Sequence, residues 1–400
     1  MIAAVCWLLP LECGDNRLRR LAPSAKDNNT REAPRMTRLH DLHEAGQSVW
    51  LDFIKRDMLE NGELADLVGD GIRGLTSNPS IFQQAIAGSE LYDEQILEVI
   101  RQDPEAAPAA VFERLAIQDI RGAADILRPV YDDSDAADGF VSLEVSPHLA
   151  HDSEATMADA FRLWEAVQRP NLMIKVPSTP AGVPAMEELT AAGINVNATL
   201  MFSLESYVAI ATAYVRGLER ATDPSRIASV ASFFVSRVDS KADGALEKVG
   251  TPEAMNLRGT IAVSNAKLAY RHYRDIFGDD AFGSLAARGG RPQRVLWAST
   301  STKNPAYSDV LYVDDLIGNN TVNTLPPNTL DAFVDHGSID PNALEIGVEQ
   351  AADRINSLEG LGIDFGQLTD ELQAEGVAAF SDSFDDLLST LANKMAALRA

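Results

Sequence analysis

Short apolar stretches alternate with amphipathic stretches along most of the chain, and this alternation restricts the folds open to it. Eight apolar stretches have the length and composition of buried strands. They span residues 48–54, 72–78, 140–145, 172–176, 194–201, 227–235, 294–298 and 320–325. The eighth is the weakest, because Asn323 interrupts its apolar character. Strands that alternate with helices pair in parallel, and eight such units favour a closed barrel over an open sheet. The sequence therefore predicts an α/β protein, a single (β/α)8 TIM barrel with additional helices.

Amphipathic stretches between the strands predict the helices of this barrel. An alanine-rich stretch spans residues 104–127, and residues 262–277 carry a buried face at three- and four-residue spacing. Thr179 is a candidate N-cap for the helix that contains Leu189. Residues 341–400 are helical by pattern, and we expect them to pack across the barrel mouth or against its flank.

The chain is strongly acidic, with 34 basic and 59 acidic side chains among 400 residues and a net charge of −25. Such a surface repels nucleic acid and anionic membranes, so we expect neither as a partner. No stretch approaches the roughly 20 apolar residues of a membrane span. Basic groups that bind a phosphorylated substrate must therefore be placed locally against the overall charge.

The first 35 residues differ in composition from the rest of the chain. Residues 1–10 are apolar, but the nearby arginines follow this stretch, whereas a secretory signal carries its basic residues before it. We interpret residues 1–35 as a disordered leader or a misassigned start, with Met36 as the functional start of a barrel domain at 36–400. A weak targeting segment is the alternative interpretation.

Cysteines and histidines give no pattern typical of metal binding. Cys6 and Cys13 are the only cysteines, so the sequence predicts neither a disulfide framework nor a cysteine-ligated zinc site. Two histidine pairs have three-residue spacing, His40 with His43 and His148 with His151. Because no carboxylate pattern accompanies them, we interpret them as helix or loop features and expect no metal.

Lys175 is the residue that most directly suggests chemistry. It lies in the apolar strand 172–176, between Asn171 and Pro177, where a strand is covered on both faces. A lysine in that position either extends to solvent or acts as an amine in an apolar pocket. Burial disfavours an ammonium ion, so a buried amine is a nucleophile near neutral pH, as a Schiff-base enzyme requires. On this segment alone, both interpretations stay open.

Polar residues occur in or after six consecutive predicted strands, where a purely structural core would avoid them. They are Asp52, Asn78, Glu144, Lys175, Asn197, Thr199 and Ser232. Taken singly, Asp52 can pair with Lys55 or Arg56, Asn78 suits a turn before Pro79, and a strand threonine is ordinary. Taken together they predict one polar cluster at the carboxyl ends of the strands, where barrels place catalytic residues.

Four motifs resemble those of transaldolases, the class I Schiff-base aldolase family, over roughly residue 37 to the C-terminus. They are Gly-Leu-Thr-Ser-Asn-Pro-Ser at 74–80, Ile-Lys-Val-Pro-Ser-Thr at 174–179, Gly-Ile-Asn-Val-Asn-Ala-Thr-Leu-Met-Phe-Ser at 193–203 and Ser-Phe-Phe-Val-Ser-Arg at 232–237. The segment Trp-Ala-Ser-Thr-Ser-Thr-Lys-Asn-Pro-Ala-Tyr at 297–307 is similar to the longer bacterial subgroup. The resemblance implies transfer of a dihydroxyacetone unit from sedoheptulose 7-phosphate to glyceraldehyde 3-phosphate, giving erythrose 4-phosphate and fructose 6-phosphate. It further implies a cytoplasmic enzyme of the non-oxidative pentose phosphate pathway that needs no cofactor, as a monomer or homodimer.

The resemblance also implies a role for each matching residue. Lys175 corresponds to the Schiff-base lysine, and Asp52 to the general acid/base that takes the proton of the C4 hydroxyl. Glu144 and Thr199 correspond to the pair that holds a catalytic water. The groups that bind the ketose hydroxyls or the phosphate correspond to Thr76, Asn78, Asn197, Ser232, Arg237, Ser301 and Lys303. Lys303 stands where many members place an arginine, which keeps the charge but loses the bidentate fork.

Two other functions compete with transaldolase. A related aldolase cleaves fructose 6-phosphate without group transfer, and its pattern has glutamine and tyrosine where this chain has Glu144 and Phe234. Both residues here favour the transferase. The second alternative is a barrel that binds sugar phosphates without catalysis, and the intact set of Asp52, Glu144 and Lys175 argues against it.

Overall fold

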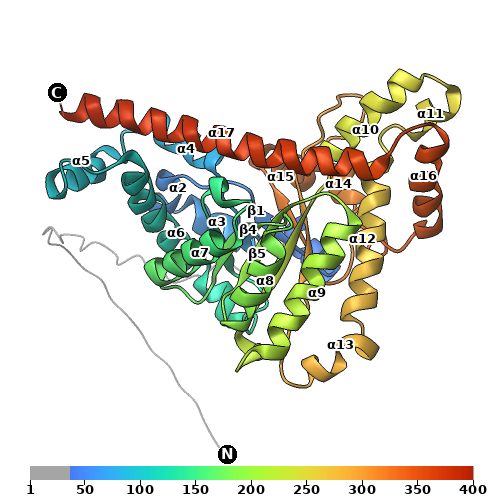
Figure 1. The fold of residues 1–400 in the computed structure, drawn as a ribbon, viewed down its shortest axis with the longest axis horizontal. Coiled ribbons are helices and arrows are strands. Elements are labelled where there is room, and N and C mark those ends of the chain that lie inside the picture. The colour runs from blue at the N-terminus through green and yellow to red at the C-terminus, as the bar shows by residue number, and fades with distance from the viewer. Residues whose placement is uncertain (1–36, 400) are drawn as a thin grey trace, which may run out of the picture. The chain divides into compact units, whose positions relative to one another are not determined.

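The computed structural model describes residues 37–399, which contain a closed eight-stranded parallel barrel surrounded by helices (Figure 1). Each strand pairs in parallel with the next, and β1 pairs with β8 to close the ring. The single (β/α)8 barrel predicted from the sequence is confirmed. The interpretations of residues 1–35, Met36, Cys6 and Cys13 lie outside the described residues. Between residues 37 and 399, no helix has both the length and the apolarity needed to span a bilayer.

The eight strands agree with the predicted stretches in position but differ in length. They are β1 (Gln47–Leu51), β2 (Gly74–Leu75), β3 (Phe140–Glu144), β4 (Leu172–Pro177), β5 (Val196–Met201), β6 (Ser229–Phe234), β7 (Arg294–Ala298) and β8 (Thr321–Leu325). The weak eighth strand is therefore present, one residue shorter than predicted. The largest error concerns residues 72–78, of which only two form a strand. Asn78 instead begins a helix, because its side chain accepts a hydrogen bond from the backbone N–H of Ile81.

Gly74 lets β2 lie close to Trp50 of the neighbouring strand β1. A Cβ atom at this position would lie 2.5 Å from the indole ring of Trp50, which is fully buried in the barrel. Only glycine lets the strand backbone approach that ring. The first strand is also shorter than predicted, so Asp52 lies just after β1 and not within it, while its backbone N–H still bonds to the carbonyl of Leu325 at 2.8 Å.

Helices connect the strands and cover the outside of the barrel (Figure 1). Those before β6 are α1 (Arg38–Glu44), α2 (Arg56–Glu60), α3 (Glu63–Gly69), α4 (Pro79–Ala87), α5 (Asp93–Gln102), α6 (Pro108–Asp133), η1 (Pro147–Leu149), α7 (Ser153–Val167), α8 (Gly182–Ala191), α9 (Leu204–Arg220) and η2 (Pro224–Arg226). Those after β6 are α10 (Ser236–Val249), α11 (Pro252–Leu257), α12 (Ile261–Phe277), α13 (Asp279–Ala286), α14 (Leu311–Asp314), α15 (Pro327–His336), α16 (Val348–Gly360) and α17 (Phe365–Arg399).

The helix predictions hold with shifted boundaries. Helix α6 begins and ends later than the predicted 104–127, and α12 matches the predicted 262–277 within one residue. Thr179 was predicted as an N-cap, but the N-cap of α8 is Ala181. The Thr179 hydroxyl still accepts a hydrogen bond from the N–H of Gly182, at 3.2 Å, so it supports the start of the helix without being its first residue.

The long helix α17 crosses the carboxyl-end face of the barrel (Figure 1). It contacts η1, α4, α10 and β5, which follow or form the carboxyl ends of their strands. The amide of Gln373 donates to the carbonyls of Ser178 and Leu200, at 3.1 and 3.2 Å, just beyond β4 and within β5. Of the two placements predicted for residues 341–400, the barrel mouth is therefore correct for α17.

Candidate functional site

Lys175 lies in the middle of β4 with its side chain inside the barrel. Only 7% of the side chain is exposed, so the lysine does not extend to solvent. Its Nζ lies 3.9 Å from Oε2 of Glu144 and donates a hydrogen bond to the carbonyl of Ser77 at 3.3 Å. The alternative of a solvent-exposed strand-end lysine is therefore wrong.

Strand register brings the neighbours of Lys175 to it. Glu144 on β3 and Asn197 on β5 both occupy the position directly opposite Lys175 in the parallel ladders. Side chains at the same register on adjacent parallel strands point to the same face of the sheet. Three residues about 20 to 30 positions apart in sequence thus form one row across the barrel interior.

Glu144 is a buried carboxyl group without a close polar partner. Its side chain is 5% exposed, and among the described residues neither carboxylate oxygen has a hydrogen-bond partner. Burial raises the pKa of Glu144 to about 7, while the charge of Lys175 opposes the rise and that of Asp52 adds to it. The group can therefore take up or release a proton near neutral pH.

A bulge in β5 lies next to Thr199, whose side chain lines the same cavity as Lys175. The register between β5 and β6 shifts between Ala198 and Met201, and Leu200 has a φ of 59°, which is unusual for a residue other than glycine. Thr199 keeps its backbone carbonyl in the ladder, where it accepts from the N–H of Ser178 at 2.7 Å. Among residues 37–399, the buried hydroxyl of Thr199 has no hydrogen-bond partner.

Asp52 is held by a short chain of hydroxyl groups. Thr76 donates a hydrogen bond to Oδ1 of Asp52 at 2.8 Å, and its hydroxyl also contacts that of Thr324 at 2.9 Å. Burial raises the pKa of Asp52 above its ordinary value, and the charge of Lys175 and the bond from Thr76 act in the opposite direction. Asp52 does not use Lys55 or Arg56 as partners, because Lys55 pairs with Asp57 and Arg56 with Asp119.

Asn197 and Ser232 form a second hydrogen-bonded chain on the other side of Lys175. The Ser232 hydroxyl donates to Oδ1 of Asn197 at 2.7 Å, and Nδ2 of Asn197 donates to the hydroxyl of Ser142 at 3.0 Å. All three residues are buried. These bonds fix which amide atom of Asn197 faces which neighbour, so the chain presents a defined donor and acceptor pattern.

A cavity of about 200 Å³ opens over Lys175. Its lining includes nine of the eleven candidate residues: Asp52, Thr76, Asn78, Lys175, Thr199, Ser232, Arg237, Ser301 and Lys303. The other two, Glu144 and Asn197, contact residues that line it, through the bonds described above. Residues drawn from β1 to the loop after β7 therefore meet at one place, as the sequence predicts for catalytic residues of a barrel.

Two cationic side chains, Arg237 and Lys303, line the same cavity. Arg237 is partly buried in the first turn of α10, with its guanidinium 5.5 Å from the ring centre of Phe234. Lys303 is exposed in the loop after β7. Neither forms an ion pair with any carboxylate among residues 37–399, which is unusual in a chain with a net charge of −25. Unpaired cations in a cavity are suited to an anionic ligand.

Tyr307 connects the loop that carries Lys303 to the helix that carries Arg237. Its hydroxyl donates to Oδ2 of Asp243 on α10 at 2.6 Å, and the backbone N–H of Gly259 donates to Oδ1 at 2.9 Å. A Cβ atom at Gly259, where φ is 69°, would lie 2.7 Å from the Tyr307 ring. Glycine therefore permits the ring to pack in this position.

Sequence reasoning missed several residues of the site. A signal was present for Ser142 and Thr324, because each lies on the inward-facing alternation of its strand. No signal was present for Phe380, which lies on α17 some 200 residues after Lys175. The Phe380 ring centre lies 5.7 Å from Nζ of Lys175 and forms part of the cavity wall.

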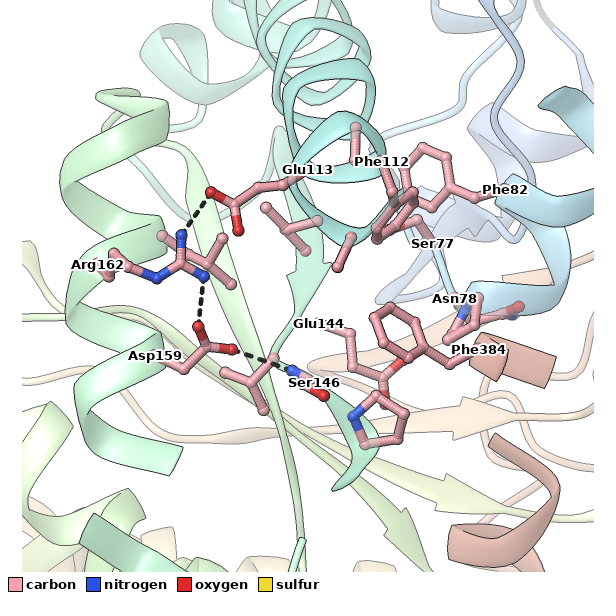
Figure 2. Close-up of a pocket in the computed structure, with 17 residues that line it drawn as sticks. Ser77, Asn78, Phe82, Phe112, Glu113, Glu144, Ser146, Asp159, Arg162 and Phe384 are labelled. Carbon is pink, nitrogen blue, oxygen red and sulfur yellow. Dashed lines mark hydrogen bonds and ion pairs between the residues drawn. The ribbon is translucent and has the colours of Figure 1, made fainter. Parts of the chain in front are cut away.

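A second cavity, also of about 200 Å³, includes Glu144 and shares Asn78 with the first (Figure 2). Three phenylalanine rings line one side of it, Phe82, Phe112 and Phe384. On the opposite side, Figure 2 shows Arg162 bridging Glu113 and Asp159, and Asp159 accepting from the N–H of Ser146 at 3.1 Å. The candidate catalytic carboxyl group thus has an apolar cavity beside it.

The histidine pairs have local structural roles. His40 completes a capping box with Thr37 at the start of α1. His148 lies 2.9 Å from Asp385 of α17. Within the part of the chain that the structure describes, no three metal-binding side chains are grouped together.

Comparison with known proteins gives a consistent result. The family model described as transaldolase/fructose-6-phosphate aldolase matches residues 49–391. A protein named transaldolase from Parafrankia sp. is 48% identical over 362 residues, covering 89% of this chain and 98% of its own length. Transaldolases from Thiobacillus denitrificans and Trichodesmium erythraeum are 48% and 45% identical, covering 88% and 89% of this chain.

Proposed function

This chain belongs to the transaldolase family of transferases, and we propose that it transfers a dihydroxyacetone unit between sugar phosphates through a Schiff base at Lys175. The donor is sedoheptulose 7-phosphate, and the acceptor is glyceraldehyde 3-phosphate. The products are erythrose 4-phosphate and fructose 6-phosphate, and the reaction is reversible. The observation that carries the proposal is the buried amine of Lys175 beside two carboxyl groups, in a cavity with two cations that have no carboxylate partner among residues 37–399.

The first step joins the lysine to the donor ketose. The free amine of Lys175 attacks the C2 carbonyl, and loss of water from the adduct gives an iminium ion. Glu144 and Thr199 hold the water and relay its protons, because both present buried oxygen atoms with no partner among the described residues. With its pKa raised to about 7, Glu144 can serve as acid when water leaves and as base when water returns.

The second step breaks the bond between C3 and C4 of the ketose. Asp52 removes the proton of the C4 hydroxyl, the C3–C4 electron pair moves toward the iminium nitrogen, and an aldehyde departs. A three-carbon enamine then remains on Lys175. Reversal of the step with a different aldehyde forms the product. Thr76 holds the Asp52 carboxylate for this role through its 2.8 Å hydrogen bond.

Polar side chains around the cavity orient the sugar. Asn78, Ser232 and the Asn197 amide bind hydroxyl groups near the reacting carbons, and Ser301 contributes a hydroxyl from the loop after β7. Arg237 and Lys303 bind the phosphate, since they are the cations of this cavity without a carboxylate partner among residues 37–399. The site therefore has a reacting end at Lys175 and a phosphate-binding end between α10 and the loop after β7.

Two residues support group transfer over simple aldol cleavage. The related fructose-6-phosphate aldolases have glutamine and tyrosine at the positions of Glu144 and Phe234. Here Glu144 supplies an ionisable group, while Phe234 is 6% exposed and places only carbon atoms on the cavity wall. Family membership also supports a cytoplasmic role in the non-oxidative pentose phosphate pathway.

A transfer assay tests the proposal. With both substrates, the enzyme forms erythrose 4-phosphate and fructose 6-phosphate, whereas without an acceptor it releases little free dihydroxyacetone. Lys175→Ala abolishes transfer and keeps the circular dichroism spectrum, while Lys241→Ala, which removes a surface lysine paired with Glu371 and Glu375, stays active. Rapid release of dihydroxyacetone without acceptor would instead assign the aldolase activity, and full activity of Lys175→Ala would refute the proposal.

A further inference from the structure

Phe380 is an aromatic residue of the site that comes from outside the barrel. It lies on α17 and is only 7% exposed. Its ring centre is 5.7 Å from Nζ of Lys175, and it lines the same cavity as Asp52 and Thr199. Every other residue described above for the reacting end belongs to a strand or to a loop at the end of a strand, so Phe380 closes the cavity from the helix side.

Helix α17 is fixed on both sides of Phe380. About two turns before it, Gln373 donates to the carbonyls of Ser178 and Leu200. One turn after it, the Ser383 hydroxyl contacts that of Ser80 at 2.9 Å. These bonds connect the helix to the ends of β4 and β5 and to α4, so the ring is held at one depth over Lys175.

Gly376 lets the helix approach the barrel at this point. A Cβ atom there would lie 3.1 Å from Cδ2 of Leu200, tighter than almost all ordinary contacts of this kind. Leu200 is the residue with a positive φ in the bulge of β5. Helix α17 therefore approaches the barrel closely beside the bulge next to Thr199, one helical turn before Phe380.

The three-carbon enamine faces two competing reactions in this cavity. In transfer, its C3 atom forms a bond to the carbonyl carbon of an acceptor aldehyde, and the aldehyde oxygen takes a proton. In the competing reaction, C3 takes a proton instead, water adds to C2, and the C2–N bond breaks. The second route consumes one water and returns free dihydroxyacetone and the Lys175 amine. Exclusion of solvent from the intermediate suppresses this route.

We propose that Phe380 shields the Lys175-bound intermediate from bulk water and thereby determines the ratio of transfer to hydrolysis. The inference rests on the proposed function. The ring covers the amine with carbon atoms, which offer no hydrogen bond to an entering water. Its face also attracts the positive charge of the iminium nitrogen, so it favours the covalent state over the released one.

The test measures two products in the presence and absence of acceptor. We expect Phe380→Ala to raise dihydroxyacetone release relative to transfer by about tenfold or more, because its removal opens the cavity to solvent. Phe380→Leu retains much of the apolar volume, so we expect a smaller rise in the same direction. If Phe380→Ala does not fold, Phe380→Leu still decides the question.

Phe384 provides the matched control. It lies one turn further along α17, packs against Phe112 with ring centres 5.7 Å apart, and lines the second cavity instead of the first (Figure 2). We expect Phe384→Leu to keep the product ratio of the parent within about twofold, since access of water to the Lys175 cavity is unchanged. An equal rise in Phe384→Leu and Phe380→Leu would indicate general loosening of α17 and would overturn the inference.

The outcome separates this inference from the proposed function. If the parent transfers the three-carbon unit and both Phe380 variants keep its product ratio, the shielding role is wrong while the enzyme assignment stands. If the parent shows no transfer and forms no adduct at Lys175, the proposed function itself fails.

Discussion

Glu144 and Lys175 occupy opposed positions on β3 and β4, with 3.9 Å between Oε2 and Nζ, and 5% and 7% of their side chains exposed. This separation is longer than a hydrogen bond. The two groups therefore attract one another electrostatically but form no direct hydrogen bond. Glu144 also lines the second, largely apolar cavity. In the proposed mechanism, the pair binds and releases a water as the imine forms and breaks.

The raised pKa of Glu144 predicts a specific pH dependence of stability. Because the folded-state pKa is about 7 and the ordinary value is 4.5, the folded protein binds this proton more tightly than the unfolded chain does. The corresponding stabilisation is present below pH 4.5 and is lost as pH rises toward 7. We expect the free energy of unfolding of Glu144→Gln, relative to the parent, to increase between pH 5 and pH 8 by on the order of 1–3 kcal/mol.

Urea denaturation at several pH values measures this difference. Glu187→Gln is the control, because Arg216 holds the pKa of the half-buried Glu187 below its ordinary value. For this variant, we expect no increase in relative unfolding free energy above pH 5. A constant difference between Glu144→Gln and parent across this range would show that Glu144 is not protonated in the folded state near neutrality.

Lys303 is predicted to contribute to the binding of phosphorylated substrates and not to the catalytic steps. Lys303→Ala removes one of the two cations from the phosphate-binding end of the cavity, so KM for phosphorylated substrates should rise about five- to tenfold while kcat changes little. Lys303→Arg keeps the charge and should keep KM within a few-fold. Lys248→Ala, an exposed lysine near the end of α10, controls for net charge. An unchanged KM in Lys303→Ala would refute a phosphate role.

Tyr307 is predicted to position the Lys303 loop without touching substrate. Tyr307→Phe removes the hydrogen bond to Asp243 and keeps the ring that packs on Gly259. We expect a rise of about threefold to tenfold in KM for phosphorylated substrates, with kcat and the dihydroxyacetone product ratio unchanged. A fall in kcat with constant KM would place the effect at the reacting end instead.

Asp138 is predicted to stabilise the opposite end of the barrel. It is buried and accepts hydrogen bonds from Trp50, Arg73 and Arg294 at 2.9, 3.0 and 3.0 Å. Burial disfavours its charge, but Arg294 and the hydrogen bonds outweigh burial and hold the pKa of Asp138 below its ordinary value. Its stabilisation is therefore present at neutral pH and is lost as pH falls below about 4.

Removal of the Asp138 side chain leaves two buried or partly buried guanidinium groups without this partner. Asp138→Ala should lower the free energy of unfolding by about 3–5 kcal/mol, with near-parental KM in the folded fraction. Asp132→Ala, which breaks an exposed pair with Arg128, should cost less than about 1 kcal/mol. Equal losses in the two variants would show that the buried network contributes no more than a surface pair.

The sequence was sufficient to predict the barrel, because apolar strands and amphipathic helices differ in period and length. It also predicted that the polar residues of consecutive strands meet, since such residues converge at the carboxyl ends of a parallel barrel. Strand limits were less predictable. Residues 76–78 follow β2 as a loop and helix cap, because the Asn78 side chain bonds to the backbone of α4, and that choice depends on local capping and not on hydrophobic pattern.

Contacts made by distant helices were beyond sequence reasoning. Phe380 follows the apolar periodicity of any buried helical residue. That periodicity does not predict that its ring lies over the amine of Lys175. The bulge at Leu200 was likewise unforeseen, because leucine gives no signal of a positive φ. Both features depend on how α17 packs against β5, and this packing is a property of the assembled fold.

The central claim is that the amine of Lys175 becomes covalently bonded to a ketose. Borohydride reduction in the presence of fructose 6-phosphate, followed by mass spectrometry of the peptides, tests it most directly. We predict a reduced three-carbon adduct on Lys175 and none on Lys241 or Lys303. Product formation with Lys175 unmodified, or an adduct at another lysine, would contradict the account.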